Sequence, residues 1–413
     1  MKSLLLFCAL LLSLSIIAQE RNRIFGKAVQ RSNGAPIPNA SIFISGSSLG
    51  TMTDAAGNFE LNGVPSGNFQ LIISSIGFTT IVYPFSTENL PLRLNVQMDE
   101  KAEELSEVTV EPFDPDGWHN WGNLFTQLFI GTSKAASQCR IINNKALRFR
   151  YNKSKRLLTV LADEPLIIEN FYLGYTVKYQ LEEFNYDQDD RVITFYGYPF
   201  FTDKQEKRGG TPPRYIQRRE EVYNGSINHF MWALYNDRLS EEGFEVRRMA
   251  HETNYEKERI KKIMASEARR NISSGGVTVM RLGVAPPADS MNYYRQVMKQ
   301  PDELKRIGAD LLRADSLLLP GKDSTKQLLF PHYLQVVYKN GREEKKYLLS
   351  TRQSRKAGFP VSEIFLVDES GIFIYPNGYY FPPRAIFALE YWAWSEKISH
   401  LLPLGYAPPS RKN

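Results

Sequence analysis

The segment from Arg23 to Met98 alternates apolar and polar residues along short runs. Such alternation lets one face of a strand pack into a core while the other face meets water. The runs are Ile42–Ile44, Phe59–Leu61, Phe69–Ile73 and Leu92–Met98, and the turn clusters between them are Ser32–Gly34, Asp54–Gly57, Asn62–Gly63 and Pro65–Gly67. Asp and Asn can bond their own backbone in a turn, and Gly accepts a positive φ. Short strands separated by such turn clusters predict an antiparallel sandwich.

Spaced residues in the same segment follow the order of one known family. They are Ile24, Gly26, Val29, Gly34, Pro36, Ile37, Ala40, Gly50, Thr51, Thr53, Asp54, Gly57, Phe59, Leu61, Pro65, Gly67, Phe69, Leu71, Ser74, Ile76, Gly77 and Phe78. The series resembles the carboxypeptidase-regulatory-like domain, a transthyretin-like sandwich of seven strands. Leu105–Val110 resembles the segment that often follows this domain in proteins of Gram-negative envelopes. The resemblance implies an accessory module, and such a module does not transmit an activity.

The first residues predict export. Lys2 precedes an apolar stretch from Leu4 to Ile17, and Ala18 offers a small residue for cleavage before a polar run. This is the layout of a secretory signal peptide, and the stretch is shorter than the roughly 20 residues that cross a bilayer core. We expect residues 1–18 to be a signal peptide, with no transmembrane segment after its removal. The expected location is the periplasm, the outer membrane or the cell surface.

Charge and cysteine content argue against a nucleic-acid-binding protein and against a fold held by disulfides. Removing Lys2 lowers the basic residues from 51 to 50 against 45 acidic residues, so the mature net charge would be +5. The signs are interspersed, which is typical of a solvated surface, and we expect no nucleic-acid partner. Removing Cys8 leaves Cys139 alone, so no intramolecular disulfide can form. Its apolar neighbours favour a core position over a reactive thiol.

No catalytic, cofactor or metal site can be assembled from the motifs. None of the five histidines has Glu three residues later, and His251-Glu252 lacks the second His of a zinc motif. Ser48 lies in a Gly-x-Ser-x-Gly pattern, but a turn follows it instead of the helix that a nucleophile elbow needs. We therefore predict no catalytic residue, no cofactor and no metal. Catalytic residues can also lie far apart in sequence, so an enzyme of unknown class with its site in residues 119–413 is the alternative.

The chain is predicted to divide into a sandwich domain at 19–110, a linker at 111–118 and an α+β region of unknown function at 119–413. Pro112, Pro115 and Gly117 interrupt regular structure in the linker. The α+β region forms one domain or two subdomains. Its first part predicts a largely antiparallel sheet, with strands at Leu147–Tyr151, Leu157–Leu161, Leu166–Glu169, Gly174–Leu181 and Val192–Tyr198.

Three helices are predicted after this sheet. An apolar stripe from Ile227 to Leu239 follows the cap Asn224-Gly225-Ser226, and Gly243 ends the helix. His229 and Trp232 lie off the stripe, so they form a contact surface or, as we favour, a partly buried flank. The run Tyr255–Arg270 predicts a charged helix with a solvated face, the alternative being a surface for an acidic polymer or lipid headgroups. Pro301 opens a further helix.

The last part predicts mainly β structure rich in aromatic residues. Asn340-Gly341 suits a hairpin turn between Tyr333–Tyr338 and Lys345–Leu349. Further strands follow at Ile364–Val367, Ile372–Tyr375, Tyr379–Phe381 and Ala385–Phe387, then a short amphipathic helix containing Trp394, Ile398, Leu401 and Leu402. The cluster Tyr391-Trp392-x-Trp394 is either a ligand platform or core, and core is favoured because each aromatic buries about 150–250 Å².

These observations predict an exported cell-envelope protein with a non-catalytic binding or scaffolding role. The expected partner is another envelope protein or a glycan. A deep pocket that gathers charged residues such as Glu252, Asp368 or His332 would favour the enzyme alternative. An aromatic groove would favour binding.

Overall fold

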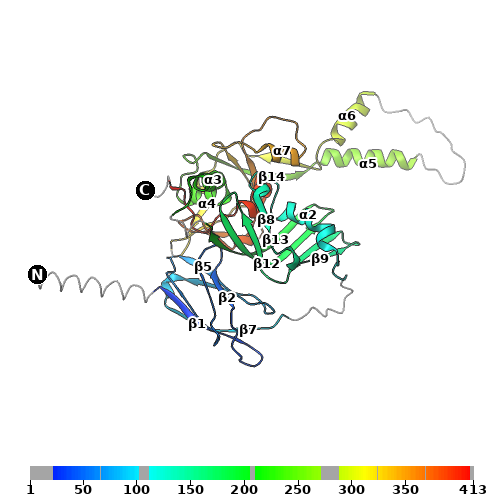
Figure 1. Ribbon diagram of the computed structural model, residues 1–413. Coiled ribbons are helices and arrows are strands. Elements are labelled where there is room, and N and C mark those ends of the chain that lie inside the picture. Colours follow the sequence, from blue (N-terminus) through cyan, green and yellow to red (C-terminus); the bar gives the residue numbers. More distant parts are fainter. Residues whose placement is uncertain are drawn as a thin grey trace, which may run out of the picture.

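Three strand-rich units follow one another along the chain in the computed structural model (Figure 1). The structure describes residues 22–65, 67–101, 111–204, 210–270, 288–322, 324–367 and 369–409. We refer to 22–101 as the sandwich, 111–223 as the middle unit, 224–396 as the C-terminal unit and 397–409 as the C-terminal segment. The predicted signal peptide and Leu105–Val110 lie outside the described residues.

The sandwich has the predicted strands in two sheets, of order β4-β1-β7 and β3-β2-β5-β6. The strands are β1 (Arg23–Gln30), β2 (Ser41–Ile44), β3 (Gly50–Met52), β4 (Asn58–Asn62), β5 (Asn68–Ser74), β6 (Ile81–Ser86) and β7 (Leu92–Met98), with a 3-10 turn η1 (Thr87–Asn89). Ile24, Ile42 and Leu71 are fully buried between the sheets. One pair departs from the antiparallel expectation, because β1 and β7 run parallel.

The turn around Gly57 has the predicted geometry. The Asp54 carboxylate accepts from the backbone N–H groups of Ala56 and Asn58 at 2.9 and 2.7 Å. Gly57 has φ +80°, and a Cβ there would lie 2.5 Å from the carbonyl oxygen of Ala28. Both the backbone conformation and the space therefore require glycine at this position.

The middle unit is an antiparallel sheet of order β8-β11-β12-β10-β9, with β13 along the other side of β12. Its strands are β8 (Cys139–Ile141), β9 (Leu147–Asn152), β10 (Leu157–Ala162), β11 (Leu166–Asn170), β12 (Tyr175–Asp187) and β13 (Val192–Asp203). Its helices are α2 (Gly117–Phe129) and α3 (Pro213–Tyr223), with 3-10 turns η2 (Ala136–Gln138) and η3 (Asn144–Ala146). The predicted sheet is thus confirmed.

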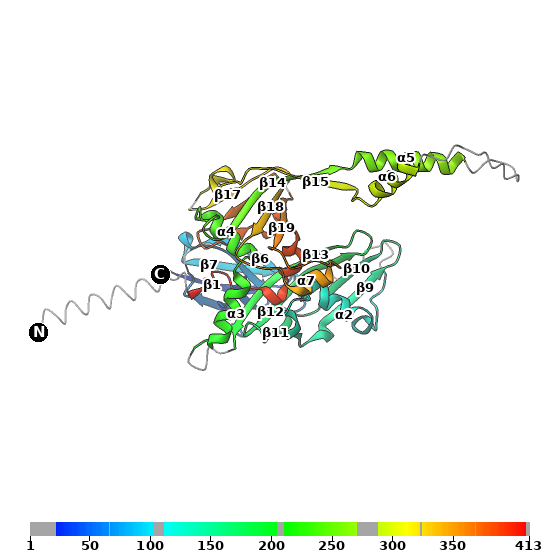
Figure 2. The same ribbon diagram turned by 90° about the horizontal axis from the view of Figure 1, so that it is seen from above.

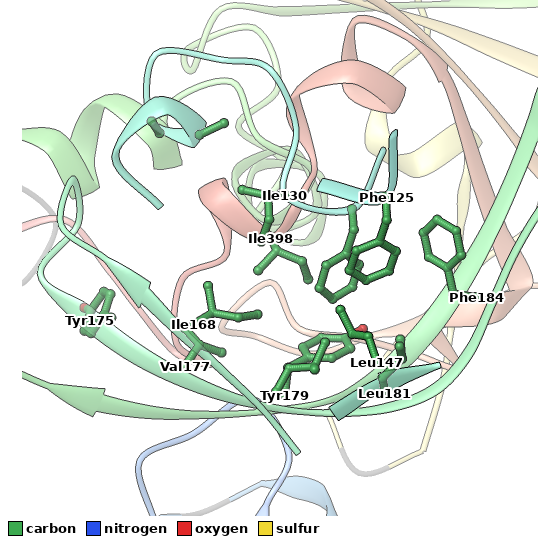
Figure 3. Close-up of a cluster of buried hydrophobic side chains, with 14 of the residues drawn as sticks. Phe125, Ile130, Leu147, Ile168, Tyr175, Val177, Tyr179, Leu181, Phe184 and Ile398 are labelled. Atoms are coloured by element: carbon green, nitrogen blue, oxygen red, sulfur yellow. The ribbon is translucent and has the colours of Figure 1, made fainter. Parts of the chain in front are cut away.

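Helix α2 packs on this sheet and contributes to its core (Figure 3). Phe125 lies edge-on to Phe184 with 4.8 Å between ring centroids, and Ile398 of the C-terminal segment joins the same cluster. The sequence patterns predicted neither α2 nor α3. Gly117 begins α2 instead of breaking regular structure, because its N–H binds the Asp114 carbonyl and the helix follows directly.

The C-terminal unit contains an antiparallel sheet of order β15-β14-β18-β19-β22 and a small sheet of order β16-β17-β20-β21. The strands are β14 (Phe244–Thr253), β15 (Glu303–Ile307), β16 (Leu318–Pro320), β17 (Lys326–Leu328), β18 (Tyr333–Tyr338), β19 (Val361–Leu366), β20 (Ile372–Ile374), β21 (Tyr380–Phe381) and β22 (Ile386–Glu390). The helices are α4 (Ile227–Tyr235), α5 (Tyr255–Arg270), α6 (Ala288–Met298), α7 (Lys345–Ser350) and α8 (Tyr391–Ser395), with 3-10 turns η5 (Ala314–Ser316) and η6 (Pro383–Ala385). The 3-10 turn η7 (Ile398–His400) follows in the C-terminal segment.

Four predictions for this unit are wrong in part or in whole. Lys345–Leu349 is not a strand: β18 pairs with β14 and β19, and the residues after Asn340-Gly341 form α7. The residues after Pro301 form strand β15, because they pair with β14. Helix α4 ends at Tyr235, well before Gly243. The last helix is split into α8 and η7.

The predicted charged helix is present as α5, which projects from the body beside α6 (Figures 1 and 2). Ile260 and Val297 are buried, and the Glu256 carboxylate accepts from Arg259 and from the Tyr293 hydroxyl. In the part of the chain that the structure describes, no helix has the length and apolar character needed to span a membrane.

Candidate functional site

A cavity of about 690 Å³, here the junction cleft, lies where the sandwich, the middle unit and the C-terminal unit meet. The sandwich contributes Ser45, Gly46, Gln70, Thr79, Thr80 and Val82; the middle unit contributes Tyr179, Glu182, Tyr196, Gly197, Tyr198 and Pro199. The remaining lining comes from Asn228, Tyr379, Tyr380, Phe381, Pro382, Pro383, Arg384, Leu401, Leu402 and Leu404. The site therefore exists only when all three units are packed together.

Specific contacts hold the sandwich against strand β13. The N–H of Gly46 binds the Pro199 carbonyl at 2.7 Å, and the N–H of Phe201 binds the Ser47 carbonyl at 2.9 Å. These bonds cover an edge strand, whose backbone groups would otherwise remain unpaired. The buried Ser74 hydroxyl donates to the Gln180 amide oxygen at 3.0 Å. The sandwich is thus docked on the middle unit and not merely joined to it by the chain.

Glu182 owes its position to an irregularity in the sheet. The pairing of β12 with β13 shifts register between Leu181 and Glu183, so Glu182 is the extra residue of a β-bulge. Bulges redirect side chains and are common beside functional sites. Oε1 of Glu182 and Oγ1 of Thr80 are buried, and neither has a hydrogen-bond partner among the described residues. Both side chains line the cleft, so it presents polar groups that only a ligand or water can satisfy.

Tyrosines form much of the remaining wall. Tyr196 and Tyr198 lie two residues apart on β13 and therefore on one face of it, with 6.4 Å between ring centroids. Burial, and then the charge of Glu182, raises the pKa of the Tyr198 hydroxyl. Burial likewise raises the pKa of Tyr379 and Tyr380. These hydroxyls therefore stay protonated at neutral pH and can donate hydrogen bonds.

Arg384 closes one side of the cleft. Its guanidinium lies 3.0 Å from the ring centroid of Tyr196, and it makes no ion pair within the described ranges. A guanidinium held on an aromatic face keeps its N–H donors available at its edge. Donor and acceptor charges thus lie in one cleft, with Glu182 supplying the acceptor.

A second group of charges surrounds a cavity of about 440 Å³ in the C-terminal unit. Buried Glu363 on β19 binds Lys305 at 2.5 Å, and His251 lies 3.2 Å from its other oxygen. Lys305 also binds Glu390 at 2.6 Å. Glu390 has φ +60° and ψ −125°, a strained conformation that costs about 1–3 kcal/mol. Each of these carboxylates already has a cationic partner, which fits a network that holds strands together.

The residues proposed as markers of an enzyme site do not gather in either cavity. Glu252 forms an exposed ion pair with Arg306 at 2.9 Å, and His332 is exposed on a turn. Asp368 lies outside the described residues. Ser48 is on an exposed loop, as predicted. Across the described ranges, no cluster of three His, Cys, Asp or Glu side chains could hold a metal ion.

The structure also settles the positions of three ambiguous residues. His229 is 1% exposed, so it is neither a contact surface nor a partly buried flank. Its Nδ1 accepts from the Gly225 N–H at 2.9 Å, and its Nε2 lies 3.1 Å from the Glu242 carboxylate. Trp392 is 2% exposed and belongs to the core, as favoured. Cys139 packs against the core of the middle unit, and burial raises the pKa of its thiol to about 12.

The family described as the CarboxypepD_reg-like domain matches residues 24–110, in agreement with the strands and the Gly57 turn. Residues 24–110 are a CarboxypepD_reg-like domain. This domain is a non-catalytic, immunoglobulin-like module. It accounts for the sandwich alone, and no catalytic family is matched by the chain.

Three solved structures show a distant likeness to the chain. A cohesin–X-dockerin complex from Acetivibrio cellulolyticus is 20% identical over 19% of this chain and 56% of that chain, with a TM-score of 0.15. A 9R-lipoxygenase from Cyanothece is 9% identical over 52% and 48%, with a TM-score of 0.16. A putative membrane-associated protein of unknown function from Bacteroides fragilis is 9% identical over 86% and 95%, with a TM-score of 0.15.

The chain thus spans about half the length of the first two structures. At these TM-scores, none of the three informs the function. No curated protein matches the chain.

Proposed function

We propose that this chain is an exported cell-envelope protein with a non-catalytic binding role, and that its ligand is a glycan held in the junction cleft. The observation that carries the proposal is Glu182, which lines a cleft walled by tyrosines and whose buried Oε1 has no hydrogen-bond partner among the described residues. The export component rests on the signal-like residues 1–18. N-terminal sequencing of protein from the envelope fraction tests it, with a start near Gln19 expected.

The dimensions and chemistry of the cleft favour a glycan over a protein partner. A cavity of about 690 Å³ is of the size that encloses a small ligand, typically about 300–1,000 Å³. A pyranose ring has an apolar C–H face and an edge of hydroxyls. The rings of Tyr196 and Tyr198 suit the face, while Glu182, Thr80 and Arg384 suit the edge.

The same lining favours binding over hydrolysis. Glycosidic cleavage generally needs two carboxyl groups flanking the scissile bond. Among the described residues that line the junction cleft, Glu182 is the only carboxylate. A glycan held there would meet one carboxylate, and not the pair of carboxyl groups that acid–base catalysis needs. We also expect the purified protein to release no C-terminal residue from peptides, with or without chelator.

The test is a glycan-array screen of the mature protein, followed by titration calorimetry of the strongest hit with two variants. Glu182→Gln keeps the side-chain size and removes the charge. Glu183→Gln is the matched control, because the neighbouring carboxylate accepts from Asn185 and does not line the cleft. A hydrogen bond to a charged group contributes about 1.5–3 kcal/mol, so E182Q should weaken binding roughly 10- to 100-fold.

E183Q should bind like the wild type. Wild-type affinity in E182Q would contradict the assignment of the site, and the absence of any glycan ligand would contradict the proposed function.

A further inference from the structure

A separate cavity of about 660 Å³, here the cationic cleft, lies between the middle unit and the C-terminal unit. Lys134 enters it from the middle unit, in the connection after α2. Arg342, Lys345 and Lys346 enter it from the turn and helix that follow β18. Four cationic side chains from two units therefore border one concave space.

None of these four cations forms an ion pair with any carboxylate that the structure describes. Lys134 lies over the Tyr172 ring at 5.7 Å, and Arg342 lies over the Phe359 ring at 4.3 Å. Lys346 donates to the Ser133 carbonyl at 3.1 Å. These contacts position the side chains without neutralising their charge.

The carboxylates in the same lining are already engaged. Glu344 Oε2 accepts from the Lys134 backbone N–H at 3.1 Å. Glu221 Oε2 accepts from the Tyr172 hydroxyl at 3.1 Å. Glu396 Oε1 accepts from the Ile227 N–H, the first of helix α4, at 3.2 Å. The lining therefore holds four cationic side chains and three carboxylates, and the carboxylates are held by neutral donors instead of by the four cations.

We propose that the cationic cleft is a second ligand site, which binds a small molecule through a carboxylate, sulfate or phosphate group. Charged side chains from both units would contact the anion, and the Tyr172 and Tyr391 hydroxyls supply further polar lining. Ammonium and guanidinium groups bind such anions through charge-assisted hydrogen bonds. This proposal is independent of the glycan site, since the two clefts share no lining residue.

Glu396 makes the site sensitive to pH. Burial raises the pKa of its carboxyl to about 7, so it gains negative charge as the pH rises through neutrality. Burial lowers the pKa of His400, which also lines the cleft, to about 4, so His400 stays neutral over that range. Glu396 shares the cleft lining with Glu221, Glu344 and the four cations. Next to it in the chain is Lys397, whose pKa burial lowers to about 8, and the charge of Glu396 adds to the rise in the pKa of Tyr380. Binding of trigalacturonate, whose carboxylates keep their charge over this range, should therefore be tighter at pH 6 than at pH 8.

The experiment is titration calorimetry of the full-length mature protein with inorganic phosphate, trigalacturonate and neutral trigalactose as probes. Phosphate and trigalacturonate distinguish a phosphate-bearing ligand from a carboxylate-bearing one. At least one anion should bind with an affinity that falls as salt rises, and trigalactose should not compete for the site. The double variant Lys134→Gln/Lys345→Gln should weaken binding at least tenfold.

Two further variants keep the proposal falsifiable. Lys299→Gln is the matched control, because Lys299 is also exposed and lies outside the cleft. It should bind like the wild type, and Glu396→Gln should abolish the difference between pH 6 and pH 8. All four lysine and glutamate positions are at least partly exposed, so folding can be verified by circular dichroism. Failure of both anions to bind, or an equal loss in K299Q, would overturn the site.

Discussion

Two carboxylates in this protein, one buried and one half-buried, have opposite surroundings. Glu363 is 2% exposed and has Lys305 and His251 at its two oxygens, whereas one oxygen of Glu182 has no partner in the described structure. Burying a charge without compensation is costly, so an unpaired carboxylate in a cleft indicates a group reserved for a ligand. The sequence could not predict this role for Glu182. The predicted strand ends at Leu181, just before Glu182, and only the pairing of β12 with β13 creates the bulge.

Glu396 gives a pH-dependent prediction at this scale. Its folded-state pKa is about 7 against an ordinary value of 4.5, so the folded protein binds more protons than the unfolded chain between these values. Its contribution to stability is therefore fully present below 4.5 and declines as the pH rises toward 7. The variant Glu396→Gln has no ionisable group at this position, so its stability does not show this decline with pH.

The unfolding free energy of E396Q relative to wild type should rise across that interval, measured by urea denaturation in steps of pH. Burial lowers the pKa of His400, so its effect on the pH dependence of stability has the opposite sign to that of Glu396. This effect is the same in wild type and E396Q, so it cancels from the difference between them. A difference that is constant or falls with pH would contradict the assignment.

Turns and helix caps that depend on hydrogen bonds between nearby residues could be predicted from the sequence. Strands and helices whose form depends on pairing with distant segments could not. The Asp54–Gly57 turn and the Ser226 cap of α4 depend on residues a few positions apart, and both are present. The hairpin expected at Asn340-Gly341 is absent because β18 already has partners on both sides, β14 and β19. The helix expected after Pro301 is likewise replaced by β15, which completes the sheet beside β14.

A glycine comparison tests the turn of the sandwich. Gly57 and Gly34 both have positive φ, but only at Gly57 would a Cβ meet backbone, 2.5 Å from the Ala28 carbonyl oxygen. Gly57→Val should lower the unfolding free energy by about 1–3 kcal/mol from backbone strain, with a further cost from the contact. Gly34→Val has only the strain. Thermal or urea unfolding of both variants should rank G57V as the less stable, and equal stabilities would show that the contact is relieved elsewhere.

At the scale of the whole molecule, the sequence predicted a module followed by a separate region, and the structure adds how they are joined. The C-terminal segment crosses unit boundaries: Ile398 and Leu402 enter the core of the middle unit, and Leu404 packs against the sandwich core. Local sequence patterns do not predict these contacts, because the contacts depend on how units far apart in the chain pack together. The junction cleft could not be predicted for the same reason, although its aromatic segments Tyr196–Phe200 and Tyr379–Phe381 are conspicuous in the sequence.

Docking of the sandwich should therefore control ligand binding. Phe200 contacts Phe43 across the interface with 5.5 Å between ring centroids, and it does not line the junction cleft. Phe200→Ala should speed hydrogen exchange at the Gly46 and Phe201 amides and weaken glycan binding. Phe171→Ala removes an exposed phenylalanine that does not line the junction cleft, so it is the control and should change neither. Faster exchange with unchanged affinity in F200A would show that docking and binding are uncoupled.

The most direct test of the central claim is hydrogen exchange of the mature wild-type protein with and without a saturating glycan from the array. The account predicts slower exchange in the three segments that wall the junction cleft, around residues 79–82, 179–182 and 379–384. The projecting helices α5 and α6 should be unaffected. Slower exchange confined to surfaces outside the cleft, with these segments unchanged, would contradict the claim that the junction of the three units is the glycan site.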